Sequence, residues 1–491
     1  MSELGVPKSS IAYRTSELVG RSREKDKICA AVQNGVHLVY LEGVGGIGKT
    51  RLLEEISEFV ADLSPTSLVL GIIDFYDTAM HGSLSVEQEI VDQLQELGIA
   101  GKHFDLFLEN MGLYRVSEID DEREVHAAFI QSFNSWVGER QVILRFDTGE
   151  ALEYGQDAPE VLEECEVHGA EAPAFQWLRE QLGCLEHTTA IVAARPTRKL
   201  CDQLKSAYED GNWLLLQLDT LSLEETQRYF EISPHGKQID AEMVERIWLL
   251  SAGRPILLSL AIDWLIRGMK VGEIYDIDLD TLRGKRKSGG EAWEIILRRF
   301  EQALVHGFRR LETPLDAAIY YAARARKGFT ADILRRMLRD LCSRQIELSP
   351  AEAEKLMQKM RRLSFVKHPH GAREGWFFLH DEMYDLVDRY VWRSDYPAYT
   401  HQAETARFLT DKIYSEEATG GLIAEALKSL QDAKTYPEMR QARSHLDKLW
   451  TEQLFYWLEA DPLDGYQRYR RLDIQAISQR NREWDDMLRI E

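Results

Sequence analysis

Apolar and polar residues alternate along the first half of the chain with two different periods. Short, mostly apolar runs predict five buried strands, at residues 36–41, 67–74, 141–147, 187–196 and 214–218. Between and beside these runs, apolar residues recur at helical spacing, at residues 24–33, 51–56 and 86–97. This alternation predicts a parallel sheet with helices on both faces. Residues 100–138 carry helical patterns without a clear place in that scheme.

From residue 220 onward the spacing of apolar residues is helical. Helices are predicted at residues 223–230, 243–251, 255–267, 293–304, 314–325, 330–342 and 350–361. Two short apolar segments, 365–368 and 376–379, flank a turn and predict a hairpin, which after these helices suggests a winged-helix arrangement. The basic segment 283–290, which contains several glycines, predicts a linker. Residues 399–491 show helical spacing throughout.

Residues 43–50, Gly-Val-Gly-Gly-Ile-Gly-Lys-Thr, lie between the first strand and a helix and satisfy the phosphate-loop pattern at every fixed position. Glycines let several backbone N–H groups point at phosphate oxygens, and the helix N-terminus adds partial positive charge. We expect Lys49 to reach the β- and γ-phosphates and Thr50 to offer its hydroxyl to Mg²⁺. The candidate nucleotide contacts here are Gly43, Gly45, Gly46, Ile47, Gly48, Lys49, Thr50 and Arg51.

Three charged residues near the ends of later strands are candidates for metal binding and hydrolysis. Asp147 ends an apolar strand, where phosphoryl transfer needs an acid to hold the Mg²⁺ that bridges the phosphates. Glu150 either positions or deprotonates the attacking water, or is a solvated loop acid. Arg195 emerges at the C-terminal end of another strand, where its forked donors suit the γ-phosphate; a plain surface arginine is the alternative.

Composition and charge narrow the class of protein. The 491 residues are 44% apolar and 29% charged, as in ordinary globular proteins. No apolar run approaches the roughly 18 residues of a membrane span, and the first ten residues lack a secretory signal, so we expect a cytoplasmic protein without a membrane partner. The five cysteines are scattered, without metal-ligand spacing. The net charge of −22 opposes attraction to a phosphate backbone, so no direct nucleic-acid binding is expected.

Motifs in the first part of the chain resemble the STAND class of signal-transduction ATPases, which includes NB-ARC and NACHT-like modules. Residues 19–21, Val-Gly-Arg, look like the family's motif before the phosphate loop. The resemblance implies that Gly20 and Arg21 contact adenine. Residues 43–50 are similar to the NB-ARC phosphate loop. The acid three positions after Asp147 is similar to NACHT-like members, whereas NB-ARC proteins have an immediate second aspartate.

Two later motifs extend the resemblance. Residues 253–255, Gly-Arg-Pro, resemble the Gly-x-Pro motif, which implies that Pro255 packs on the adenine. Residues 379–381, Leu-His-Asp, resemble the Met-His-Asp motif, which implies that His380 touches the β-phosphate of bound ADP. The stretch 451–462 resembles the helical arm that joins the switch module to a sensor in bacterial members.

Patterns and resemblance together predict four parts. They are an α/β P-loop domain (1–219), a small helical domain (220–285), a winged-helix domain (286–395) and a helical arm leading toward a sensor (396–491).

The resemblance implies an ATP/ADP-controlled signalling switch. Bound ADP would hold a closed monomer, an unknown inducer acting through the sensor would drive exchange for ATP and self-association, and slow hydrolysis would reset the protein. One alternative is an AAA-type remodelling ATPase that hydrolyses steadily, with an arginine supplied in trans. Another is a transcription regulator whose winged helix binds DNA.

Overall fold

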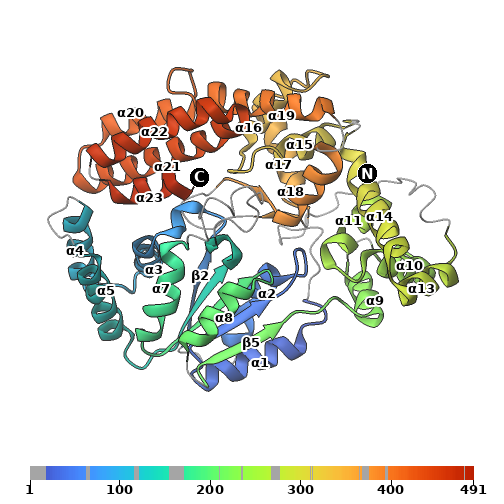
Figure 1. The fold of residues 1–491 in the computed structure, drawn as a ribbon, viewed down its shortest axis with the longest axis horizontal. Coiled ribbons are helices and arrows are strands. Elements are labelled where there is room, and N and C mark those ends of the chain that lie inside the picture. Colours follow the sequence, from blue (N-terminus) through green and yellow to red (C-terminus); the bar gives the residue numbers. More distant parts are fainter. Residues whose placement is uncertain are drawn as a thin grey trace, which may run out of the picture. The chain divides into compact units, whose positions relative to one another are not determined.

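Five parallel strands form the central sheet of the protein, seen here in a computed structural model (Figure 1). The structure describes residues 18–61, 67–115, 121–153, 171–208, 211–233, 236–266, 277–309, 311, 313–363, 365–367, 375–392, 396–479 and 481–490. One of the cysteines, Cys165, and part of the turn within the predicted hairpin lie outside these residues.

The sheet has the strand order β2-β3-β4-β1-β5, and every neighbouring pair is parallel. Its strands are β1 (Leu38–Glu42), β2 (Leu68–Asp74), β3 (Val142–Asp147), β4 (Thr188–Ala194) and β5 (Trp213–Gln217). All residues of β3 and β4 are buried, which explains why these two strands have continuous apolar runs instead of an alternating pattern. The predicted parallel sheet is confirmed, with all five strands within two residues of their expected positions.

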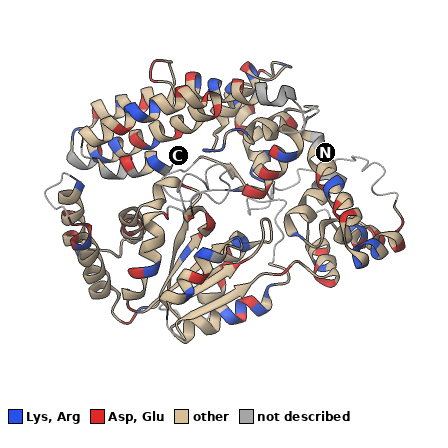
Figure 2. Ribbon diagram, in the orientation of Figure 1, with Lys and Arg blue, Asp and Glu red and all other residues tan. Residues whose placement is uncertain are grey.

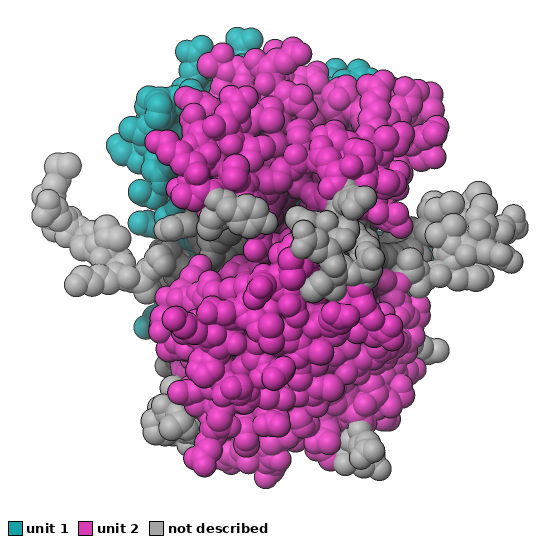
Figure 3. All heavy atoms as spheres, turned by 90° about the vertical axis from the view of Figure 1, so that its left-hand side faces the viewer, with its two compact units in different colours: residues 1–20, 45–48, 219–409 teal, residues 21–44, 49–218, 410–491 magenta. Residues whose placement is uncertain are grey.

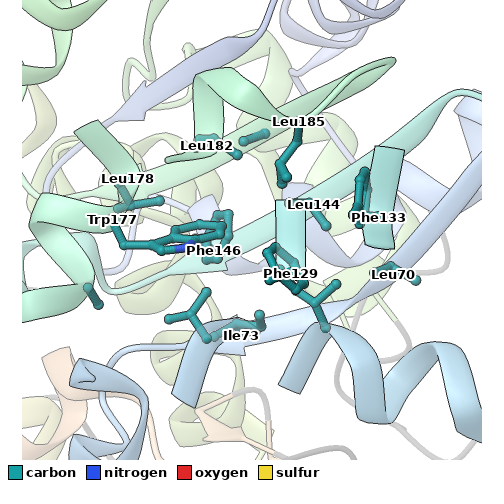
Figure 4. Close-up of a cluster of buried hydrophobic side chains, with 14 of the residues drawn as sticks. Leu70, Ile73, Phe129, Phe133, Leu144, Phe146, Trp177, Leu178, Leu182 and Leu185 are labelled. Carbon is teal, nitrogen blue, oxygen red and sulfur yellow. The ribbon is translucent and has the colours of Figure 1, made fainter. Parts of the chain in front are cut away.

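Helices connect the strands, as parallel strands require long crossovers. Helix α1 (Ser22–Gln33) precedes the first strand, and the connecting helices are α2 (Lys49–Ala61), α3 (Ser83–Glu96), α4 (Asp105–Arg115), α5 (Glu122–Val137), α7 (Pro173–Glu180) and α8 (Arg198–Ala207). Helices α4 and α5 occupy the segment that the sequence pattern left unplaced. Aromatic side chains of α5 and α7 pack against β3 in the core, where the rings of Phe146 and Trp177 lie 6.2 Å apart (Figure 4).

The chain forms two compact units, coloured separately in Figure 3. Unit 1 comprises residues 1–20, 45–48 and 219–409, and unit 2 comprises residues 21–44, 49–218 and 410–491. Residues 45–48 of the phosphate loop thus group with the helices that follow the sheet. The four predicted domains and their limits stay a prediction.

Unit 2 also contains the C-terminal helices α20 (Leu422–Asp432), α21 (Tyr436–Ala460), α22 (Pro462–Ser478) and α23 (Arg482–Ile490). Thr435 caps α21 with a reciprocal bond pair to Glu438, and the rings of Trp450 and Trp484 stack 5.2 Å apart between α21 and α23. The array is tied to the sheet domain of the same unit, because Lys448 ion-pairs with Asp77.

Unit 1 is mostly helical. Its helices are α9 (Leu223–Ile232), α10 (Ala241–Ser251), α11 (Pro255–Ile266), α13 (Leu279–Ser288), α14 (Glu291–Arg309), α15 (Pro314–Ala322), α16 (Ala331–Asp340), α17 (Pro350–Met360), α18 (Asp381–Val387) and α19 (Tyr396–Phe408). Strands β6 (Val366–Lys367) and β7 (Phe378–Leu379) pair antiparallel after α17. This is the helices-then-hairpin order that the sequence predicted.

The linker predicted at residues 283–290 is wrong, because most of this segment belongs to helix α13. Asp278 caps the helix by accepting a hydrogen bond from the Thr281 N–H. Arg283 binds both carboxylate oxygens of Glu245, and the Arg286 guanidinium lies 3.9 Å from the centre of the Trp248 ring. Arg283 and Arg286 therefore anchor the helix, and the basic residues of its last turn, Lys285, Arg286 and Lys287, also suit the helix dipole.

Candidate nucleotide site

The phosphate loop connects the end of β1 to the start of α2, as the motif requires. Gly46 and Gly48 have φ angles of +71° and +100°, which residues with a Cβ atom rarely adopt. The Gly43 N–H donates to the Ala194 carbonyl oxygen at 3.2 Å, so the start of the loop is fixed to the end of β4. Helix α2 begins at Lys49, so the N–H groups of its first turn, which have no carbonyl partner within the helix itself, lie beside the loop.

Lys49 lies at the first position of α2 and is buried. Its Nζ donates to the carbonyl oxygens of Gly43, at 2.6 Å, and Val44, at 3.2 Å. The ammonium group is therefore held against the loop itself, where phosphate oxygens would meet it together with the loop N–H groups.

The structure brings together the two residues expected to hold Mg²⁺. Thr50 Oγ1 donates to Asp147 Oδ2 at 2.6 Å, although the residues are 97 positions apart. Thr50 follows β1 and Asp147 ends β3, and β4 lies between these two strands. The C-terminal ends of parallel strands nevertheless meet at one edge of the sheet. A hydroxyl and a carboxylate beside a phosphate loop fit Mg²⁺, which uses one or two protein oxygen ligands together with phosphate and water. Among the described residues there is no cluster of three His, Cys, Asp or Glu side chains suited to a metal.

Glu150 and Arg195, inferred separately from the sequence, contact each other. Glu150 lies in the 3₁₀ helix η2 (Gly149–Leu152), and its Oε2 accepts a hydrogen bond from the Arg195 N–H at 2.9 Å. Its Oε1 lies 3.2 Å from Arg195 Nε. The two side chains thus hold each other at the C-terminal edge of the sheet, and their roles in hydrolysis stay a prediction.

Sequence reasoning missed Asp74 and Thr148. Asp74 ends β2 and pairs in register with Asp147, which ends β3. Thr148 donates its hydroxyl to Asp74 Oδ1 at 2.7 Å and its N–H to Asp147 Oδ1 at 2.9 Å. The sequence did carry one signal for Asp74, since it is an acid at the end of an apolar strand just as Asp147 is.

A third missed residue is Arg145, a buried charge within the otherwise apolar strand β3. Its Nη1 donates to the Leu53 carbonyl of α2 at 2.7 Å, and its Nε donates to the Leu70 carbonyl of β2 at 2.8 Å. Burial lowers the pKa of Arg145 to about 10, so the side chain stays charged at neutral pH. Arg145 therefore fixes the helix that carries Lys49 and Thr50 to the strand that carries Asp147.

The candidate contacts Arg21, Arg51 and Gly20 have the following neighbours. Arg21 is buried and precedes α1, where its carbonyl accepts a hydrogen bond from the Lys25 N–H at 2.9 Å. Arg51 ion-pairs with Glu55 of its own helix, with Nη2 and Oε1 2.5 Å apart. Gly20 has a φ of +69°, and a Cβ atom there would lie 2.8 Å from side-chain atoms of Leu221 and Glu225.

Within unit 1, the segment that follows the Gly-Arg-Pro motif contacts Gly46. Pro255 is the first residue of α11, and the next N–H, of Ile256, donates to the Gly46 carbonyl at 3.3 Å. Arg254 ion-pairs with Glu382 of α18, with Nη1 and Oε1 3.0 Å apart, and also with Glu301 of α14.

His380 precedes α18 in unit 1. Its N–H donates to the Phe365 carbonyl at 2.8 Å, and its side chain makes no capping bond to the helix. The backbone at His380 is therefore fixed to the start of the hairpin.

No protein-family model and no curated protein matches the chain. Among solved structures, the chain is similar to the ORC2 protein of Aeropyrum pernix in ADPNP-ADP complexes, with 14% identity, a TM-score of 0.33, and 78% of this chain and 96% of that chain covered. It is similar to Cdc6p of Pyrobaculum aerophilum, with 11% identity, a TM-score of 0.34, and coverage of 81% and 97%. It is also similar to the ORC1 protein of Aeropyrum pernix in complex with DNA, with 12% identity, a TM-score of 0.31, and coverage of 79% and 97%. Likeness at this level carries no argument about the function of this chain.

The expectation of no direct nucleic-acid contact is withdrawn because it rested on the net charge of the whole chain; one of the similar structures above is a complex with DNA. The physical error was to use a sum over the whole chain, whereas binding depends on the local distribution of charge. Figure 2 shows Lys and Arg interspersed with Asp and Glu along the helices, and α13 ends on the basic residues Lys285, Arg286 and Lys287. A net charge of −22 therefore does not exclude such contacts.

Among the described residues no helix is both long and apolar enough to cross a membrane. The strand order, the glycine loop between β1 and α2, and the Thr50–Asp147 pair at the C-terminal edge of the sheet together give residues 38–217 the fold of a P-loop NTPase domain.

Proposed function

We propose that the chain binds Mg²⁺·ATP at residues 43–50 and hydrolyses it. The observation that carries this proposal is the 2.6 Å hydrogen bond between Thr50 and Asp147 directly beside Lys49. It assembles an ammonium group, a hydroxyl and a carboxylate from two distant segments at the end of one glycine loop. P-loop NTPases use such a set to hold the β- and γ-phosphates and their metal.

In this mechanism the loop N–H groups and Lys49 bind the phosphates, while Thr50 and Asp147 hold the metal. Bound Mg²⁺ would neutralise charge that develops on the β- and γ-phosphate oxygens. Glu150 orients the attacking water and accepts its proton, and Arg195 fixes the orientation of Glu150. Because Arg195 is one-third exposed, its guanidinium also has access to a γ-phosphate.

A second proposal is that hydrolysis serves a conformational switch. The observation in its favour is that Gly46 of the phosphate loop accepts a hydrogen bond from the start of α11, while Arg254, just before α11, ion-pairs with α18 and α14. A change at the loop is thereby transmitted to the helices around His380. This proposal includes a closed form with bound ADP and self-association with bound ATP. It also includes an inducer that acts through a sensor.

Energies limit the role of His380 in such a switch. One charge-assisted hydrogen bond to a phosphate contributes about 1.5–3 kcal/mol. Shifting a population from 1:99 to 99:1 requires about 5.5 kcal/mol. His380 alone is therefore insufficient, and the Arg254 ion pairs with Glu382 and Glu301 are the natural candidates for the remainder.

One experiment tests ATP binding and separates the two forms of the proposal. The purified chain is denatured, the released nucleotide is identified by ion-pair chromatography, and steady-state phosphate release is measured on the same sample. Near-stoichiometric ADP with slow turnover supports the switch. Rapid, continuous turnover supports an AAA-type remodelling ATPase. A chain that neither contains nucleotide nor binds added Mg²⁺·ATP contradicts both.

A further inference from the structure

The turn between Asp147 and Glu150 has an unusual backbone. Thr148 adopts a left-handed conformation with φ +58°, which is disfavoured for a β-branched residue. Such a conformation persists only where surrounding contacts hold it. Two hydrogen bonds do so here, from the Thr148 N–H to Asp147 Oδ1 and from the Thr148 hydroxyl to Asp74 Oδ1.

Asp74 is itself fixed on both sides. It ends β2 opposite Asp147, and its Oδ1 also accepts a hydrogen bond from the Tyr76 N–H at 3.0 Å. The next residue, Phe75, donates its N–H to the Asp147 carbonyl oxygen at 3.0 Å. The Asp74 carboxylate, which accepts the hydrogen bond from the Thr148 hydroxyl, is thus held at the edge of the sheet.

The left-handed turn separates the tasks of the two acids. Asp147 lies before the turn. One of its carboxylate oxygens accepts a hydrogen bond from the Thr148 N–H, and the other accepts one from the Thr50 hydroxyl. Glu150, after the turn, reaches Arg195 at the end of β4. Between them, Gly149 passes so close to β4 that a Cβ atom would lie 3.1 Å from the side chain of Val192. The turn thus lies between an acid that contacts Thr50 and an acid that contacts Arg195.

We propose that Asp74 is a positioning residue for the metal site, acting through the Thr148 hydroxyl to hold Asp147 toward Thr50. This inference rests on the proposed binding of Mg²⁺·ATP and adds a residue to it. Asp74 acts as a hydrogen-bond acceptor, so its charge is dispensable. A direct metal ligand, in contrast, would require the charge.

Two matched pairs of variants separate these roles. Asp74→Asn keeps an acceptor oxygen at the same place and removes the charge, whereas Asp74→Ala removes both. Thr148→Ser keeps the hydroxyl, whereas Thr148→Val keeps the β-branched shape and removes it. Lys49→Met serves as the control that weakens phosphate binding by another route.

The measurement is binding of a fluorescent ATP analogue to the full chain, titrated with Mg²⁺ and repeated in EDTA. We expect Asp74→Ala and Thr148→Val to raise the Mg²⁺ concentration at half-saturation at least about tenfold, the usual effect of losing a partner of a metal ligand. Affinity in EDTA should change less than about threefold. Asp74→Asn and Thr148→Ser should stay within about threefold of the parent. The double variant Asp74→Ala/Thr148→Val should require no more Mg²⁺ than Asp74→Ala alone, because both substitutions remove the same hydrogen bond between Thr148 and Asp74.

The outcomes are distinct. If Asp74→Asn raises the Mg²⁺ concentration at half-saturation as much as Asp74→Ala does, the proposal is overturned, because Mg²⁺ binding would then require the charge of Asp74. An unchanged Mg²⁺ requirement in Asp74→Ala also overturns it. If the parent chain binds the analogue no better than Lys49→Met, the proposed function itself fails. Circular dichroism reports whether Asp74→Ala folds, and the Thr148 pair answers the question if it does not.

Discussion

Arg195 holds Glu150 through both its backbone and its side chain. The Arg195 N–H and Nε lie 2.9 Å and 3.2 Å from the two carboxylate oxygens of Glu150. The pair joins the end of β4 to the helix that follows β3, so it fixes the acid at the same edge of the sheet as Asp147 and the phosphate loop. The side chain of Glu150 remains 19% exposed, which leaves its outer lone pairs available to water.

Replacing Glu150 by glutamine should slow hydrolysis without preventing nucleotide binding. Glutamine retains an acceptor for the Arg195 N–H but cannot take a proton from water, and loss of a general base typically costs about 10²–10⁴ in rate. Single-turnover phosphate release measures the rate, and fluorescence of an ATP analogue measures affinity. Glu180→Gln, at an exposed acid of the same domain, is the control. Hydrolysis at the parent rate in Glu150→Gln would remove Glu150 from the mechanism.

Lys49→Met should weaken binding of ATP about 10- to 100-fold. The change removes a charge-assisted hydrogen bond to phosphate, worth about 1.5–3 kcal/mol. Calorimetric titration with a non-hydrolysable analogue gives the affinity. The matched control is Lys199→Met, because Lys199 is an exposed lysine that ion-pairs with Glu171 in the same domain. Full affinity in Lys49→Met would refute the site.

Much of the sheet domain was accessible from sequence because its signals are local. The strands β3 and β4 are buried on both faces, so their apolar runs were unmistakable. The phosphate loop combines glycines, lysine and threonine at fixed spacing. Placing Asp147 beside Thr50 required only the rule that parallel strands end at one edge.

The features that could not be predicted from the sequence depend on partners far apart in the chain. Segment 283–290 has the composition of a linker, but the contacts of Arg283 with Glu245 and of Arg286 with Trp248 make most of it a helix. Thr148 has a left-handed backbone conformation, which sequence rules predict for glycine and not for threonine. The role of Asp74 follows from the register of β2 on β3, which no local pattern encodes.

Lys448→Met should loosen the attachment of the C-terminal helices to the sheet domain in unit 2. Lys448 of α21 ion-pairs with Asp77, which caps the 3₁₀ helix η1 (Thr78–His81) soon after β2. Both side chains are 20–30% exposed, so the loss in unfolding free energy should be modest, about 0.5–1 kcal/mol. Hydrogen exchange should accelerate at residues 75–81.

The matched control is Lys428→Met, at an exposed lysine of α20 without an ion pair among the described residues. Equal exchange in the two variants would mean that Asp77 does not hold the array.

The stability of unit 2 should fall as pH rises from about 6.5 to about 9, because His126 is buried between two acids. Its Nδ1 lies 2.8 Å from Oε1 of the fully buried Glu87, and its Nε2 lies 3.3 Å from Glu122. Burial alone would lower the pKa of His126, but the hydrogen bonds and charges of Glu122 and Glu87 outweigh it and raise the pKa to about 9. Burial also raises the pKa of Glu87.

The sign follows from proton binding. The folded state holds the His126 proton more tightly than the unfolded state, whose histidine has a pKa near 6.5. The stabilisation is therefore complete below about pH 6.5 and is lost as pH approaches 9, by an amount on the order of 3 kcal/mol. Urea unfolding between pH 6 and 9.5 should show this decline. His126→Gln should flatten it, whereas His103→Gln, at an exposed histidine, should not. If the His126→Gln profile keeps the parent slope, the proton on His126 does not stabilise the fold.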